Sequence, residues 1–208
     1  MSSGSKIVRH KLQDRIFHWA MALCMLMLIF TGISPVIGIE FDWVPIHWIS
    51  GTIFTILIIW HLIRSIFFQD IFSMWINFSE VRSFIIAIFK NKLLKSGKYS
   101  IAQKLLHNTV TVISLVAIIT GILLMVRIDT PLWERNPYLF DQSTWGWIYV
   151  FHGLSSLCFI SIIIIHIYFA IRPEKFFYTR SMIFGSISKK DFDENHDDKL
   201  WVNKEESF

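Results

Sequence analysis

Cysteine is scarce in this chain. Only 2 of the 208 residues are cysteines, Cys24 and Cys158, and both lie in apolar stretches, where a thiol behaves as a small hydrophobic group. No Cys-x-x-Cys-His run is present to attach a c-type haem, and two thiolates are too few for an iron–sulfur cluster or a four-thiolate zinc site. Any iron–sulfur cluster that works with this chain must therefore belong to a partner.

Charge is also scarce, and its absence is local. Charged residues make up 17% of the chain and hydrophobic residues 53%, which is outside the usual composition of a soluble domain. Four stretches carry no charge at all, residues 16–39, 43–63, 105–126 and 142–171. Each reaches the roughly 20 residues that a helix needs to cross a bilayer. We therefore predict an all-α integral membrane four-helix bundle.

The four spans contain no aspartate or glutamate. Intramembrane carboxylates usually mark proton relays and substrate pathways, so their absence disfavours a transporter. The sequence also offers no nucleophile–base pair and no glycine-rich phosphate loop. Independent hydrolytic or phosphoryl-transfer chemistry therefore has no residues to perform it.

Basic residues are concentrated on one side of the predicted membrane. They precede the first span and lie between the second and third: Lys6, Arg9, Lys11, Arg15, then Arg64, Arg82, Lys90, Lys92, Lys95, Lys98 and Lys104. Short loops rich in lysine and arginine stay in the cytoplasm, so both termini are predicted to be cytoplasmic. The net charge of +4 is thus a topology signal. The basic residues do not cluster as a nucleic-acid site requires, and we expect no nucleic-acid partner.

Two segments outside the spans have recognisable composition. Residues 71–89 mix aromatic and aliphatic residues with single charges, which is typical of an interfacial amphipathic helix. After a transmembrane domain covering residues 1–180, residues 181–208 are predicted to form a polar cytoplasmic tail. Its charged run is either a solvated surface or a docking segment for a partner.

The chain shows a faint internal repeat. His18 is followed by Thr31-Gly32-Ile33, and His107 is followed at the same separation by Thr120-Gly121-Ile122. The second and fourth spans also match, because each carries two histidines fourteen residues apart. These correspondences indicate a pseudo-symmetric bundle with two equivalent halves.

Six of the eight histidines lie in or at the edge of the apolar spans, where ionisable side chains are costly and usually functional. Fourteen residues of helix make about 3.9 turns and rise about 21 Å, so His47 and His61 share one face at two depths. His152 and His166 do the same. Depth alone therefore pairs His47 with His152, and His61 with His166.

Two facing imidazoles can fill both axial positions of a haem iron. Such a haem has no open coordination position and transfers electrons. The alternative is that the histidines only form hydrogen bonds between helices. A zinc or copper site is excluded, because ligands four turns apart on one helix cannot meet at one ion. The paired spacing favours two b-type haems.

Short motifs along residues 6–180 carry a family resemblance. They are Ile7-Val8-Arg9, Asp14-Arg15, His18-Trp19, Gly32-Ile33-Ser34, Ile46-His47, Gly97-Lys98-Tyr99, Gln103-Lys104, His152 and His166. In these motifs the chain resembles the di-haem four-helix cytochrome b subunits of bacterial dehydrogenases, of the formate dehydrogenase gamma subunit and hydrogenase cytochrome b type.

The resemblance implies a specific set of ligands. It places an outer haem on His47 and His152 and a cytoplasmic haem on His18 and His166. This differs from the pairing by depth, which gives His61 to His166. We favour His18, and His61 is then an alternative ligand or a contact to haem or quinone. The family also places quinone beside the start of the third span, where Gln103 and His107 lie.

The predicted function is electron transfer between a partner iron–sulfur or dehydrogenase subunit and membrane quinone, in the bacterial inner membrane and in contact with its lipids. The direction of transfer depends on the partner. One alternative is a self-standing di-haem quinone oxidoreductase with a small-molecule redox partner, which requires a ligand site in the outer loops. A non-redox membrane anchor is the other.

Overall fold

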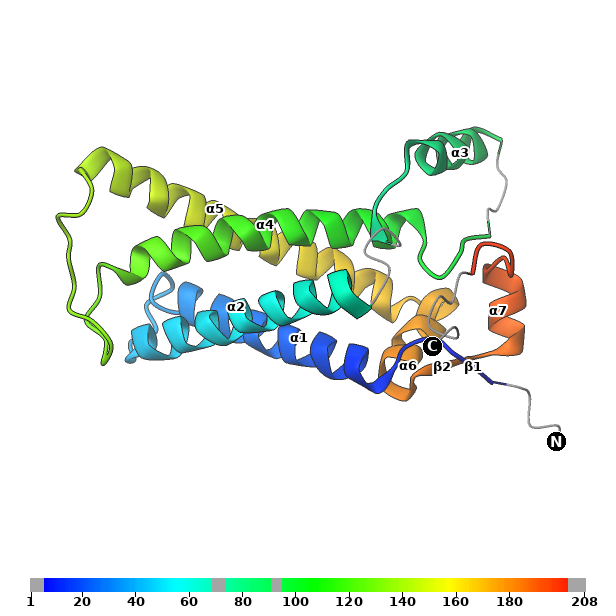
Figure 1. Ribbon diagram of the computed structural model, residues 1–208, viewed down its shortest axis with the longest axis horizontal. Helices are drawn as coiled ribbons and strands as arrows, with labels where there is room; N and C mark the ends of the chain where they lie inside the picture. The colour runs from blue at the N-terminus through cyan, green and yellow to red at the C-terminus, as the bar shows by residue number, and fades with distance from the viewer. Residues whose placement is uncertain (1–5, 69–73, 91–94, 202–208) are drawn as a thin grey trace. The chain divides into compact units, whose positions relative to one another are not determined.

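The computed structural model describes residues 6–68, 74–90 and 95–201. Four helices are long and apolar enough to cross a membrane: α1 (Leu12–Ile33), α2 (Trp43–Phe68), α4 (Ile101–Met125) and α5 (Gln142–Ile171) (Figure 1). The mostly helical fold with four long apolar helices confirms the predicted membrane four-helix bundle.

The first helix is shifted toward the N-terminus of the predicted span. α1 begins at Leu12, where the Asp14 carboxylate accepts a hydrogen bond from the Lys11 backbone N–H at 3.2 Å. A carboxylate in the first turn also suits the positive end of the helix dipole. α1 ends at Ile33, because the residue before Pro35 disfavours helical backbone. Gly38, at φ 81°, occupies the left-handed conformation in the turn that follows.

The start of α4 is defined by a capping box. The Ser100 backbone N–H donates to Gln103 Oε1 at 2.9 Å, and the Gln103 backbone N–H donates to Ser100 Oγ at 3.3 Å. These reciprocal bonds satisfy two of the backbone donors that a helix N-terminus leaves open. The helix therefore begins four residues before the charge-free stretch.

The helix predicted for residues 71–89 is shorter in the structure. α3 spans Phe78–Phe89 and follows Asn77, whose Oδ1 accepts from the Ser79 backbone N–H at 3.1 Å. The predicted residues 71–73 lie outside the described residues. Glu80 of α3 forms an ion pair with Lys104 of α4, with both carboxylate oxygens 2.9 Å from Nζ. This ion pair attaches α3 to the start of α4.

The described chain separates into two compact units. The terminal unit contains both ends of the chain, with residues 1–18, 61–109 and 166–208. The loop unit contains residues 19–60 and 110–165. The boundaries fall inside the four long helices, so each helix contributes to both units.

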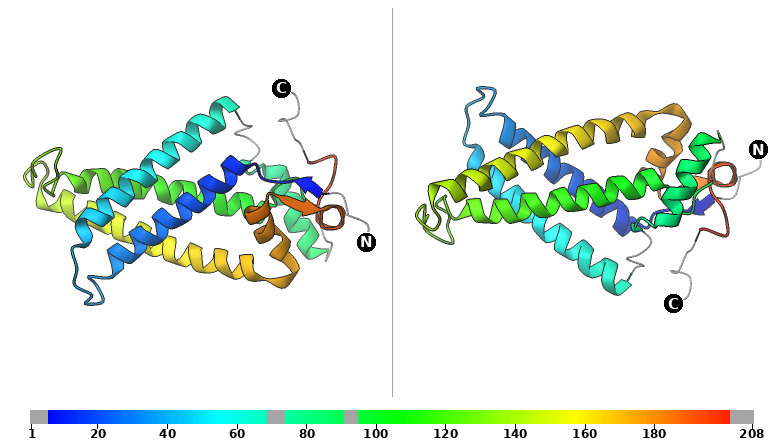
Figure 2. Two further views of the ribbon diagram at one scale, coloured as in Figure 1. Left: turned by 90° about the horizontal axis from the view of Figure 1, so that it is seen from below. Right: turned by 90° about the horizontal axis from the view of Figure 1, so that it is seen from above.

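The C-terminal part of the terminal unit is folded. After η2 (Pro173–Lys175) and α6 (Phe176–Phe184), strand β2 (Ser186–Ser188) pairs antiparallel with β1 (Lys6–Val8), and α7 (Lys189–Asn195) follows (Figure 2). The segment predicted as a polar tail therefore contains a strand and a helix as far as residue 201. Ile187 and Phe192 supply the apolar anchors, since each is 3% exposed. Residues 202–208 lie outside the described residues.

The core of the loop unit is aromatic and aliphatic. Met25, Phe54 and Phe159 are buried there, and smaller apolar side chains of α1, α2, α4 and α5 pack around them. The rings of Phe54 and Phe159 meet edge to face, with centroids 6.4 Å apart. Each ring lies seven residues, about two turns, beyond a histidine of its own helix. The core thus lies about two helical turns from His47 and His152.

Candidate functional site

The loop unit brings His47 of α2 against His152 of α5. Their ring centroids lie 6.2 Å apart and the ring planes are 72° apart. Both side chains are half-buried. The structure therefore joins the two histidines that depth and resemblance had both paired.

A threonine on the neighbouring helix anchors each imidazole. Thr31 Oγ1 of α1 lies 2.8 Å from His47 Nδ1, and Thr120 Oγ1 of α4 lies 2.9 Å from His152 Nδ1. Each threonine hydroxyl donates its single proton to its own helix, to Met27 O and to the carbonyl of residue 116, both at 2.7 Å. The threonine oxygen can then only accept a hydrogen bond, so Nδ1 of each histidine carries the proton. Nε2 keeps the lone pair that a metal ligand needs.

The glycine after each threonine lets the imidazole approach the helix. A Cβ added at Gly32 would lie 3.6 Å from His47 Cε1, and one added at Gly121 would lie 3.4 Å from His152 Cε1. A larger side chain at either position would occupy the space of the ring. The repeated Thr-Gly motif is thus a histidine-holding element, used once for each ring.

These residues fit an axially ligated haem. If two imidazole rings bind one metal ion from opposite sides, two metal–nitrogen bonds of about 2 Å and two ring radii of about 1 Å place the two ring centroids about 6 Å apart. The observed separation of 6.2 Å agrees with that value. A metal-ligating histidine almost always donates its other N–H to a fixed acceptor, which is the role of the two threonines.

The terminal unit contains two further histidine pairs. His18 of α1 lies 6.2 Å from His166 of α5 between ring centroids, and His61 of α2 lies 6.2 Å from His107 of α4. The partner found for His166 is therefore His18, whereas pairing by depth gave His61. Either pair has the separation of two axial ligands, so separation alone does not choose between them.

The surroundings of His61 differ from those of the anchored pair. Phe17 stacks on the His61 ring, with centroids 4.5 Å apart and planes 14° apart. His61 Nδ1 is buried and has no hydrogen-bond partner among the described residues. A buried polar atom without a partner is costly, and it is satisfied when a ligand supplies the missing group. His61 thus lacks the fixed acceptor that Thr31 provides for His47.

Gln103 has a structural role at the start of α4. Its Oε1 accepts from the Ser100 backbone N–H in the capping box. The side-chain amide N–H₂ of Gln103 remains available to donate to a ligand. His107 lies one turn further along α4 and faces His61.

An ion pair that was not predicted from the sequence joins the first turn of α1 to the last part of α2. Asp14 of α1 pairs with Arg64 of α2, and their side chains are 20% and 9% exposed. Arg64 is among the basic residues that predict a cytoplasmic loop. In the sequence, the Asp14-Arg15 motif is the signal that points to this ion pair.

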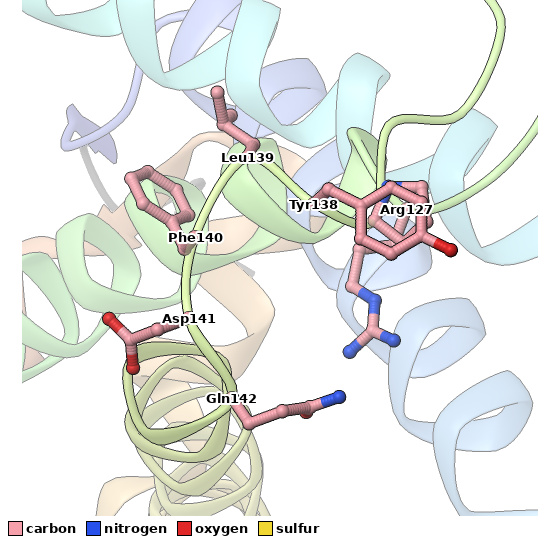
Figure 3. A pocket seen from close by; sticks show the side chains of 7 residues that line it. Arg127, Tyr138, Leu139, Phe140, Asp141 and Gln142 are labelled. Carbon is pink, nitrogen blue, oxygen red and sulfur yellow. The ribbon is translucent and has the colours of Figure 1, made fainter.

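Residues of the loop between α4 and α5 line an open pocket of about 590 Å³ (Figure 3). Its lining consists of Arg127, Pro137, Tyr138, Leu139, Phe140, Asp141 and Gln142. The Arg127 guanidinium lies 5.1 Å from the centre of the Trp145 ring and 5.6 Å from that of Tyr149, in cation–π contact.

Four membrane-length helices that carry facing imidazoles define a membrane cytochrome b. Residues 9–185 match the prokaryotic cytochrome b561 family. The chain belongs to this family, and membership implies haem b. The protein is therefore a multi-pass bacterial membrane cytochrome that transfers electrons.

A curated relative has a similar sequence. The chain is 23% identical over 185 residues to the "Formate dehydrogenase, cytochrome b556 subunit" of Haemophilus influenzae (strain ATCC 51907 / DSM 11121 / KW20 / Rd). The match covers 82% of this chain and 73% of the relative. Both findings confirm the resemblance to the cytochrome b subunit family.

Proposed function

We propose that this chain is the di-haem cytochrome b subunit of a quinone-linked dehydrogenase complex. Two haem b groups are held by His47 with His152 and by His18 with His166. Electrons pass between a partner iron–sulfur or catalytic subunit and membrane quinone. Both termini face the cytoplasm, and the protein lies in the bacterial inner membrane.

The observation that carries this proposal is the matched anchoring of His47 and His152. Two helices supply the rings, and two others supply threonine acceptors with nearly equal distances of 2.8 and 2.9 Å. Histidines that only join helices have no need of two symmetric acceptors that both leave Nε2 free. A pair of this kind is suited to hold an iron centre.

His47 with His152, and His18 with His166, would each hold a haem, and the haem would supply one-electron transfer. The chain's own residues hold the imidazoles in one tautomer and exclude water with the Phe54 and Phe159 rings. If His47 and His152 hold the iron between them, they would keep oxygen and small substrates from it. We therefore propose that the chain relays electrons and does not bind a substrate at the iron.

We place the quinone contact at His61 and His107, with the Gln103 amide as a further donor. Reduction of a quinone to a quinol takes two electrons and two protons, so donors must face its oxygens. His61 Nδ1 supports this assignment, because it is buried and lacks an acceptor among the described residues. His18 is then left as the partner of His166, which agrees with the ring separation of 6.2 Å.

The partner is proposed from the relative's name. That protein is the cytochrome b556 subunit of a formate dehydrogenase. We propose an iron–sulfur partner as well, because the two cysteines of this chain are too few to build a cluster, and any cluster that delivers electrons to it must belong to another protein. Quinone reduction and quinol oxidation use the same residues, and the partner's potential selects the direction.

The proposal is tested by haem content. Purified parent protein is compared with His18→Ala, His47→Ala and His61→Ala variants by pyridine haemochrome assay and by reduced-minus-oxidised spectra. We expect two b haems per chain in the parent and in the His61 variant, and one in each of the other two. The His61 variant should have slower quinone reduction in a detergent assay.

Loss of a haem in the His61 variant, with both haems retained in the His18 variant, would move the second haem to His61. A parent protein with no haem would overturn the whole proposal.

A further inference from the structure

A buried arginine joins three separate segments of the terminal unit. Arg9 follows strand β1 and is 2% exposed. Its Nη1 lies 2.9 Å from His196 Nε2, and its Nη2 donates to the Lys98 carbonyl oxygen at 2.7 Å. Its Nε donates to His10 Nε2 at 3.2 Å. The N-terminal strand, the loop before α4 and the end of α7 therefore meet at one guanidinium.

The cation in this cluster is enclosed by aromatic rings. The guanidinium carbon lies 4.4 Å from the centre of the Tyr178 ring and 5.5 Å from that of Trp201. In the described part of the chain, no carboxylate forms an ion pair with Arg9. Arg9 is thus stabilised by neutral acceptors and by cation–π contacts.

The hydrogen bonds define the protonation state of His196. A guanidinium has only donors, so His196 Nε2 must be an acceptor. His196 Nδ1 then carries the ring proton and donates it to the Gly97 carbonyl oxygen at 2.8 Å. His196 is also 2% exposed, so water cannot replace either contact. The closed arrangement exists only with a neutral imidazole.

We propose that Arg9 and His196 form a pH-sensitive latch, which holds residues 186–201 against the N-terminal strand and the Gly97–Tyr99 loop while His196 is neutral and releases them when His196 is protonated. The latch goes beyond electron transfer, because it needs neither haem nor quinone. It makes the packing of the chain's ends dependent on cytoplasmic pH.

Charge repulsion opens the latch. A proton on His196 Nε2 would face the guanidinium at 2.9 Å, with both side chains buried. Burial lowers the pKa of His196, and the Arg9 charge lowers it further, as Lys175 does more weakly. The carbonyls of Ser96 and Gly97 act in the opposite direction, and the Tyr178 hydroxyl lies 3.5 Å from Nε2.

The second imidazole of the cluster stays neutral. Burial, followed by the Arg9 charge, lowers the pKa of His10 to about 3. His10 therefore remains an acceptor for Arg9 at any physiological pH. His196 is the group whose protonation we assign to opening.

The direction and size of the effect follow from linkage. The pKa of His196 is lowered in the closed state and is about 6.5 when the segment is released. Protons therefore bind the open state more strongly, and the latch loses stability as pH falls below about 6.5. Between pH 7.5 and 5.5, the open-to-closed ratio should rise by up to about tenfold.

The fit of the segment supplies an independent way to open it. A Cβ added at Gly97 would collide with the Leu200 carbonyl oxygen. Gly97→Ala should therefore release the segment at any pH. The loop that carries Gly97 leads directly into the Ser100 cap of α4, so opening also loosens the support of that helix.

The test is amide hydrogen exchange of residues 186–201 in the full-length protein in detergent at pH 7.5 and 5.5. Rates are corrected for the pH dependence of intrinsic exchange, and α5 peptides from residues 142–165 of the loop unit serve as the internal reference. We expect up to about tenfold faster corrected exchange at pH 5.5 in the parent. His196→Gln, whose amide can still accept from Arg9 and donate to Gly97, should remove this dependence, and Gly97→Ala should exchange fast at both pH values.

Two results would overturn the latch. One is equal corrected exchange at the two pH values in the parent while Gly97→Ala is fast. The other is an unchanged pH dependence in His196→Gln. If His196→Gln is itself open at both pH values, Arg9→Gln decides, because a neutral amide can still donate to His196 without repelling its proton. A full pH response in Arg9→Gln would then refute the role of the Arg9 charge.

Discussion

Replacing Thr120 by valine should weaken haem binding at the His47–His152 pair without changing the fold. Valine has nearly the shape of threonine, so it removes the hydroxyl oxygen and little else. His152 Nδ1–H then loses the acceptor that lies 2.9 Å away. Thr120 is 7% exposed, so water cannot take the place of the hydroxyl.

The expected magnitude follows from the lost acceptor. A buried donor left unsatisfied costs about 1–3 kcal/mol. Loss of the group that accepts a hydrogen bond from a metal-ligating histidine typically weakens metal binding by about 10–100-fold. In free energy this equals the same roughly 1–3 kcal/mol, since each tenfold change is about 1.4 kcal/mol. The Nδ1–H bond also raises the basicity of the ligating Nε2 and so favours ferric iron. The midpoint potential of this haem should therefore rise, by about 30 mV for each threefold difference between ferric and ferrous affinity.

The assay is haem titration of the apoprotein followed by an optical redox titration. Thr55→Val is the matched control, because Thr55 Oγ1 donates only to the Gly51 carbonyl oxygen of its own helix, at 2.8 Å. The control should keep the parent's affinity and potentials. If Thr120→Val and Thr55→Val both bind two haems as the parent does, with unchanged potentials, the threonine does not anchor a ligand.

Two further substitutions test other parts of the structure. Gly121→Val should abolish the haem at this pair, because even a Cβ there lies 3.4 Å from His152 Cε1, whereas Gly146→Val, with open space around it, should keep both haems by pyridine haemochrome. Asp14→Asn breaks the ion pair with Arg64, whose side chain is 9% exposed. We expect the free energy of unfolding to fall by about 2–3 kcal/mol. In thermal unfolding of variant and parent with equal haem content, this corresponds to a Tm lower by about 5–10 °C for the variant. An unchanged Tm would show that the ion pair adds no stability.

The helices and the class of protein could be predicted from the sequence, but only some of the helix ends could: α5 spans the predicted residues 142–171 and α2 begins at the predicted residue 43, whereas α1 and α4 begin earlier than predicted. The predicted spans contain no charge, yet α1 and α4 begin among charged and polar residues, at Leu12 and Ile101. Hydropathy detects only the part of a helix that lipid covers. The first turns are built by caps such as Ser100 with Gln103, whose hydrogen bonds leave no mark in composition.

The candidate site was predictable in part for a similar reason. Six histidines in apolar spans, the fourteen-residue spacing and the Thr-Gly repeat are all visible along the chain. The sequence places Arg9 among the basic residues that mark one membrane face and in the Ile7-Val8-Arg9 motif, and it predicts a polar tail for residues 181–208, but neither pattern joins the two. In the structure Arg9 is buried against His196, which lies 187 residues away. No local pattern can encode a contact of that separation.

The sequence by itself determined the number of membrane crossings and the depth and helix face of each histidine. Length and charge defined four crossings, and helical periodicity put His47 and His61 on one face, with His152 and His166 on another. For His166 the sequence left two partners, His61 by depth and His18 by family resemblance; the tertiary structure puts His166 beside His18, and His61 beside His107 with Phe17 stacked on the His61 ring. The physical reason is that periodicity sets the direction of a side chain from its own helix axis, whereas its neighbour depends on how the helices are ordered and rotated against one another.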